Sequence, residues 1–288
     1  MKQSDKRNSW KRITTLIIPY IFIVGLFKYV GTAVSEAYID NKVIAAASTE
    51  QQLISSIFTL LGTFLVLFLF MKYIDKEPFL NLGFQYKNKG KDIFIGLLIG
   101  ILIMGFGYVI LVSFNQIKFI SITFFYSDFL IVFVIFLSVA FSEEALFRGY
   151  ILRNLMNSMN KNMALLLSAI IFTTMHALNQ NITFIGLVNL FLAGILLGLP
   201  YIYTKNLWFP ISLHFSWNFF QSLLGFNVSG KNSYSIVNFD LVEKNNFNGG
   251  DFGFEGSVLS VLSLTVLIIL TMYYFNRYGN ENKKTIFN

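Results

Sequence analysis

The residues of this sequence that could carry chemistry are polar side chains set within long apolar runs. Ionisable groups are rare and costly in such runs, so each is a candidate for function. Three groups share this setting, and they are Glu143, Glu144 and Arg148, then Phe172 and His176, then His214 and Asn218. His176 and His214 are the only histidines among the 288 residues, which favours a common role.

The first group contains two adjacent carboxylates that a helix would separate. Residues four apart share a helix face, so Glu144 stacks over Arg148 while Glu143 points elsewhere. We therefore expect an ion pair between Glu144 and Arg148, which leaves Glu143 without a local partner. A carboxylate in a poorly hydrated site can act as a general base. The alternative is that both acids neutralise Arg148 near the membrane interface.

Each histidine shares a helix face with another residue of its group. Phe172 precedes His176 by four residues and Asn218 follows His214 by four, so each pair can aim at one point. An imidazole N–H and an amide N–H together can stabilise an oxyanion. The structural alternatives are a histidine that hydrogen-bonds between helices, for His176, and a polar clamp between helices, for His214 with Asn218.

This set of side chains can activate a water and hold the oxyanion that forms at an amide carbonyl, which would hydrolyse a peptide without a covalent intermediate. The chain has no cysteine, and no apolar run offers an acid to orient a histidine beside a serine. We therefore expect neither a nucleophilic triad nor a cofactor. Glu143, His176 and His214 could instead hold zinc, although no His-Glu-x-x-His motif is present.

The composition indicates that helices in a membrane position these residues. Hydrophobic residues make up 55% of the chain and charged residues 13%, whereas a soluble domain has about 25% charged residues. The apolar runs are continuous rather than alternating, which predicts helices. This composition excludes a disordered chain, a soluble enzyme and a fibrous repeat.

Eight apolar runs approach the length of about 20 residues that a membrane span needs. They are Ile13–Val34, Leu53–Ile74, Ile93–Phe114, Phe129–Phe147, Met163–Asn179, Phe184–Tyr203, Leu207–Phe226 and Val258–Phe275. We therefore predict an all-α, polytopic membrane protein that forms one transmembrane domain over residues 1–288. Its motif-bearing core would cover about 127–226.

The basic residues predict the orientation of these spans. Most of the 22 Lys and Arg residues fall in the segments on the N-terminal side of alternating spans. The opposite loops hold Lys42, Lys118, Lys231 and Lys244, while Lys28 lies in the first span, where it is expected to snorkel or to pair. The positive-inside rule then places both termini in the cytoplasm. The net charge of +7 is thus a sign of topology and of contact with anionic lipid, and we expect no nucleic-acid partner.

The three polar groups fall at similar depths in this arrangement. A helix rises about 1.5 Å per residue, which places Glu143, His176 and His214 roughly 14–22 Å from the nearest basic residue on the inner side. Groups on three separate helices at one level favour a shared site. The connections are expected to be simpler, with a flexible exterior loop at Asn227–Ser257 and an ordinary charged inner connection at Lys72–Asp92 that has room for one interfacial turn.

The three groups together resemble the motifs of the CPBP family, the CAAX protease and bacteriocin-processing group of intramembrane endopeptidases, also called Abi. The patterns Glu-Glu-x-x-x-Arg, Phe-x-x-x-His and His-x-x-x-Asn occur in the family's order over about Phe141–Phe219. The resemblance implies a glutamate-type membrane protease, and the lack of cysteine and of a zinc-ligand helix motif predicts that it is metal-independent. In it Glu143 and His176 would activate water and His214 and Asn218 would stabilise the oxyanion, with supporting residues Glu144, Arg148 and Phe172.

The resemblance also implies a substrate class. Eukaryotic members cut prenylated CaaX proteins, and bacterial relatives are linked to bacteriocin or signal-peptide processing and to self-immunity. Compact loops, the absence of targeting tails and the lack of cysteine favour the plasma membrane of a bacterium, where prenylated substrates are not expected. A membrane-associated peptide, such as a bacteriocin or pheromone precursor, is then the expected partner. A non-catalytic scaffold or immunity factor and a proton-coupled transporter stay open, although the sequence shows no internal repeat.

Overall fold

The computed structural model describes residues 9–38 and 48–284 of the chain. The basic residues of segment 1–8 and Lys42, which the orientation argument used, lie outside this part. Eight long helices dominate the described residues: α2 (Ser9–Tyr38), α3 (Thr49–Leu69), α4 (Gly90–Ser113), α5 (Tyr126–Glu144), α7 (Lys161–His176), α8 (Phe184–Thr204), α9 (Trp208–Leu223) and α10 (Val258–Lys284). The predicted all-α, polytopic membrane fold is confirmed in this form.

Six helical segments among the described residues are long and apolar enough to cross a membrane. The longest runs over 33 residues, Tyr126–Ser158, because α5 continues through the π-helix η3 (Ala145–Leu152) into α6 (Arg153–Ser158). α7 and α9 have 16 residues each and end before the predicted bounds of the fifth and seventh spans. The number of crossings and the side of the termini therefore stay predictions.

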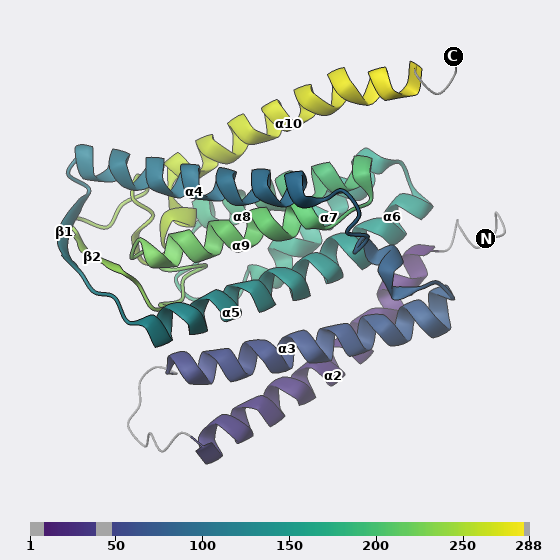
Figure 1. The fold of residues 1–288 in the computed structure, drawn as a ribbon, viewed down its shortest axis with the longest axis horizontal. Helices are drawn as coiled ribbons and strands as arrows, with labels where there is room; N and C mark the ends of the chain where they lie inside the picture. Colours follow the sequence, from purple (N-terminus) through teal and green to yellow (C-terminus); the bar gives the residue numbers. More distant parts are fainter. Residues whose placement is uncertain (1–8, 39–47, 285–288) are drawn as a thin grey trace.

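The long helices alternate in direction along a common axis (Figure 1). α2 packs against α3, α4 against α9, and α7 against α8, while α5 lies between α3 and α9. The first turn of α2 and the last turns of α10 lie at the same side, on the right of Figure 1. We call this side the inner face, following the charge-based orientation, and the opposite side the outer face.

Small residues allow α4 to approach α9 closely. Gly96 and Gly100 face Ser212 and Ser216 of α9, and a Cβ atom at either glycine would collide with the serine hydroxyl opposite. The hydroxyl of Ser216 donates a hydrogen bond of 3.1 Å to the carbonyl of Gly96. Such small-residue contacts are a common way to join helices in a membrane. They fix the helix that carries His214.

The inner connection Lys72–Asp92 holds more structure than the expected charged link. The π-helix η1 (Phe70–Asp75) extends into it, and it contains the 3₁₀-helix η2 (Phe79–Leu82). The buried carboxylate of Asp75 accepts hydrogen bonds from Arg12 at 2.7 Å and from the hydroxyl of Tyr150 at 3.0 Å. The connection thereby joins α2 to the segment that follows the Glu143-Glu144 pair.

The segment Asn227–Ser257 is not the irregular loop that we expect from its composition, while its exterior position stays a prediction. Strand β2 (Val237–Leu241) pairs antiparallel with β1 (Ile117–Ile122), which links this segment to the connection between α4 and α5. Two 3₁₀ turns follow, η4 (Gly250–Phe252) and η5 (Phe254–Gly256), and they bury Phe252 and Phe254. The segment, which we call the outer cap, folds back over the helix ends at the outer face. Composition alone did not indicate a strand partner more than 100 residues away.

Candidate active site

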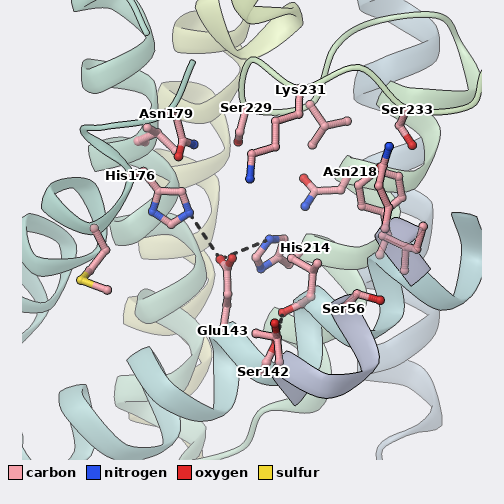
Figure 2. Close-up of a pocket in the computed structure, with 18 of the residues that line it drawn as sticks. Ser56, Ser142, Glu143, His176, Asn179, His214, Asn218, Ser229, Lys231 and Ser233 are labelled. Atoms are coloured by element: carbon pink, nitrogen blue, oxygen red, sulfur yellow. Dashed lines mark hydrogen bonds and ion pairs between the residues drawn. The ribbon is translucent and has the colours of Figure 1, made fainter. Parts of the chain in front are cut away.

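Three helices bring their polar residues together as the depth argument predicts. Glu143 lies in the last turn of α5, His176 ends α7, and His214 lies inside α9. The Nε2 atom of His176 is 3.6 Å from Oε2 of Glu143, and that of His214 is 3.9 Å from the same oxygen (Figure 2). The carboxylate of Glu143 thus stands between two imidazoles at a spacing that leaves room for a shared proton donor.

His176 is held by the backbone of its own helix. Its Nδ1 lies 2.8 Å from the carbonyl oxygen of Phe172, which accepts a hydrogen bond from Nδ1–H. In the neutral ring the proton then sits on Nδ1, so Nε2 accepts, as does the carboxylate of Glu143. Two acceptors 3.6 Å apart need a donor such as water between or beside them. The arrangement suits the binding of a water that is to be deprotonated.

Phe172 also stabilises the supporting charges. Its ring lies against the imidazole of His176, with centroids 4.5 Å apart, and under the guanidinium of Arg148 at 4.7 Å. The guanidinium is thereby placed over an aromatic face, which lowers the cost of burying its charge.

Glu144 connects the predicted ion pair to the second histidine. Its Oε1 accepts a hydrogen bond of 2.8 Å from Arg148, as the i,i+4 spacing predicts, and another of 2.8 Å from Nδ1 of His214. Both Glu144 and Arg148 are fully buried, at 0% and 1% exposure. Arg148 also donates to the carbonyl of Gly194 on α8. A chain from Arg148 through Glu144 to His214 therefore fixes the ring of His214 with Nε2 toward Glu143.

Asn218 lies one turn beyond His214 on α9. Its side chain is buried and faces the same cavity, opposite His176 (Figure 2). Within the described part of the chain its amide makes no hydrogen bond, so it is available to a ligand. Nε2 of His214 donates as well when both nitrogens of that ring carry a proton, and the two groups then form the pair of donors that the sequence predicts for an oxyanion.

These residues line a cavity of about 940 Å³ that extends well beyond them. Its walls include polar residues that the sequence analysis did not assign to the site, and they come from three places: α2 (Lys28, Thr32, Glu36), α3 (Gln52, Ser56, Thr59) and the outer cap (Ser229, Lys231, Glu255). The spacing of Gln52, Ser56 and Thr59 marks one face of a helix and could have revealed the α3 wall. No pattern pointed to the residues of the outer cap.

Glu255 is a third carboxylate in the cavity wall. Its Oε2 accepts hydrogen bonds of 2.8 Å from both the backbone N–H and the hydroxyl of Ser229. Burial raises the pKa of Glu255 above its ordinary value, although the bonds from Ser229 and the charges of His176 and His214 oppose the shift. Lys28, expected to snorkel or pair, lies in the same cavity wall.

The zinc alternative gains no geometric support. Among residues 9–38 and 48–284, no three His, Asp or Glu side chains are grouped so as to hold a metal ion. The two histidines present Nε2 to Glu143, but the carboxylate itself occupies the position between them.

Residues 124–220 match the family model of the Rce1-like type II CAAX prenyl endopeptidases. This match confirms the CPBP resemblance over about a third of the chain, and the matched segment contains all three motifs. No curated protein and no solved structure matches the chain significantly. The helices α2, α3 and α10 and the outer cap lie outside the matched segment.

Proposed function

We propose that this multi-pass membrane protein is an intramembrane endopeptidase that hydrolyses peptide bonds with water activated by Glu143. The Rce1-like match supports a protease of the CPBP type. The observation that carries the mechanism is the position of the Glu143 carboxylate between Nε2 of His176 and Nε2 of His214. In this position the carboxylate of Glu143 can serve as the base, and Nε2 of His176 can accept a hydrogen bond that orients the water. The groups proposed to stabilise the oxyanion, His214 and Asn218, lie beside them.

The reaction begins with a water held by Glu143 and Nε2 of His176. Its oxygen attacks the carbonyl carbon of the scissile bond while Glu143 takes a proton. The negative charge on the former carbonyl oxygen is stabilised by the amide of Asn218 and by His214, whose Nε2–H donates when the ring is protonated. The C–N bond then breaks, and the proton passes from Glu143 to the leaving nitrogen. The products are a carboxylic acid and an amine.

Glu144 and Arg148 act through His214 rather than on the substrate. The Glu144 carboxylate accepts a hydrogen bond from Nδ1–H of His214 and so fixes the orientation of the ring. Arg148 balances the charge of Glu144. We therefore assign both as positioning residues.

The substrate is a peptide or protein segment at the membrane, and the lipid bilayer is its setting. For a bacterial plasma-membrane protein, a bacteriocin or pheromone precursor, or a self-immunity target, is the class that the CPBP resemblance favours. A non-catalytic scaffold would keep the fold without the chemistry, so the test has to measure cleavage.

The test compares membrane proteomes of cells that express the wild type, Glu143→Gln or Asp128→Asn. Asp128 lies in the first turn of the same helix and outside the cavity, which makes it a matched acid control. Peptide N-termini that appear with the wild type and with Asp128→Asn, and are absent with Glu143→Gln, would support proteolysis. Equal sets of N-termini from all three proteins would support the scaffold instead.

Removal of metal separates the glutamate mechanism from the zinc alternative. Cleavage of a substrate found in this way should survive a strong chelator, because no step of the proposed reaction uses a metal. Loss of cleavage that added zinc restores would instead assign Glu143, His176 and His214 as metal ligands.

A further inference from the structure

The cavity of the candidate site runs in one direction from the catalytic groups. Toward the inner face the site is closed, because all eight residues of η3 that follow the Glu143-Glu144 pair are buried. Toward the outer face the walls become exposed at Lys28, Thr32 and Glu36 on α2 and at Lys231 on the outer cap. The cavity is therefore a funnel, with its closed end at the catalytic residues and its open end at the outer face. A substrate can approach it from the outer face.

The walls of this funnel are polar where a membrane span should be apolar. Lys28, Thr32 and Ser35 lie at i, i+4 and i+7 on α2, and they line the cavity together with Gln52 and Ser56 of α3. Side chains of this kind face water or polar ligands inside a membrane protein rather than lipid. The opposite face of α2 is apolar and exposed, as Leu26 and Val30 show with 50% and 40% exposure. The polar stripe therefore marks a wetted passage between α2, α3 and the outer cap.

The outer cap supplies the other wall. Figure 2 shows Ser229 and Lys231 pointing from the cap toward the space above Glu143 and His176. The exposed side chain of Lys231 and the carboxylate of Glu255 lie in the same cavity wall. This wall offers charges of both signs and hydroxyls, which suits a hydrated peptide backbone with polar side chains.

We propose that the active site is entered through this funnel from the outer, extracytoplasmic face, and that the enzyme takes polar peptide segments presented on that side of the membrane. The inference rests on the proposed protease function for the identity of the ligand and on the charge-based orientation for the side. Exported or surface-exposed peptides are thus the substrate class, and cytoplasmic chains are excluded from the site.

The natural absence of cysteine allows a direct test, because any introduced cysteine is the only one in the chain. We would make Ser56→Cys and Asn232→Cys in the funnel, Lys87→Cys on the inner connection, and Ile18→Cys at an exposed apolar position of α2 outside the cavity wall. Intact cells would be treated with a membrane-impermeant trimethylammonium thiosulfonate, and the remaining thiols counted before and after permeabilisation.

We expect Ser56→Cys and Asn232→Cys to be labelled to completion in intact cells, Lys87→Cys only after permeabilisation, and Ile18→Cys under neither condition. Labelling of Ser56→Cys only after permeabilisation would overturn the outer entrance, as would labelling of Lys87→Cys in intact cells. Failure of Ser56→Cys to react on either side, with Asn232→Cys reactive, would overturn the funnel.

The labelling needs no proteolysis, so its outcome is independent of whether Glu143 is the base. In a cleavage-competent preparation, labelling of Ser56→Cys should also abolish cleavage of added peptide, while the same treatment of Lys87→Cys should leave it unchanged. Unchanged cleavage after complete labelling of Ser56→Cys would contradict entry through this passage.

Discussion

At the residue scale, the two adjacent glutamates differ in what surrounds them. Glu143 is partly exposed to the cavity, and within residues 9–38 and 48–284 its close ionic contacts are with the two imidazoles. Glu144 is fully buried and balances Arg148 and His214. Glu143 can therefore exchange a proton with water, whereas the carboxylate of Glu144 is hydrogen-bonded to Arg148 and His214.

We predict that Glu144→Gln lowers both the stability and the activity of the protein. Loss of one partner of a buried ion pair costs about 3–5 kcal/mol, because the other charge is left uncompensated. Arg148 and His214 would both lose the charge that stabilises them. Thermal unfolding in detergent and the amount of protein in the membrane would measure the effect. Wild-type stability of Glu144→Gln would show that the pair is not structural.

Glu255 provides a prediction of pH dependence. Burial raises its pKa above the ordinary value of 4.5, so the folded state disfavours its charge. Below pH 4.5 the carboxyl group is protonated in the folded and in the unfolded protein, so it does not affect the free energy of unfolding. As the pH rises from 4.5 to above the raised pKa, the unfolded protein ionises this group more readily than the folded one, and the free energy of unfolding falls. Glu255→Gln should therefore raise Tm near neutral pH, and the gain should vanish near pH 4.

The control for this measurement is Glu243→Gln, since Glu243 is an exposed acid of the same outer cap. In a chain of this size about 1 kcal/mol shifts Tm by about 2–4 °C, and we expect a gain of that order. A gain of Glu255→Gln that is equal at pH 4 and pH 7 would contradict the account, because it could not come from the charge.

At the element scale, the close contact of α4 and α9 positions His214 and Asn218. We predict that Gly100→Ala lowers both Tm and cleavage, because the new Cβ would collide with the side chain and backbone of α9. Gly105→Ala on the same helix is the control, since nothing lies within 4 Å of its added Cβ. It should be neutral or gain up to about 1 kcal/mol from its helix propensity. Similar losses for both variants would show that the contact does not position α9.

The elements also show what the sequence can and cannot predict. The spacing of four residues within one helix was sufficient to predict the ion pair between Glu144 and Arg148. The distances from the basic residues on the inner side were sufficient to predict that Glu143 lies at the same depth as both histidines. The bond from Glu144 to His214 depends on how α9 is rotated against α5, which no local pattern contains. The π-helical turn η3 and the β1–β2 pairing likewise arise from tertiary contacts.

At the scale of the whole molecule, the matched segment and the rest of the chain contribute different parts of the site. Residues 124–220 carry the glutamates, the histidines and Asn218. The passage that leads to them is lined by α2, α3 and the outer cap, which lie outside that segment. We infer that the residues of the CPBP motifs carry out the reaction, whereas the surrounding parts of the chain determine which substrates reach them.

The central claim is that Glu143 is the general base of a peptidase, and it is tested by the parallel turnover of two purified variants in lipid discs. With a peptide substrate from the proteome comparison, Glu143→Gln should unfold at the wild-type temperature and cleave at least about 10²-fold more slowly, the lower range for loss of a general base. Glu144→Gln should be slower and also less stable. If Glu143→Gln keeps most of the wild-type rate, Glu143 is not the base and the proposed mechanism is wrong.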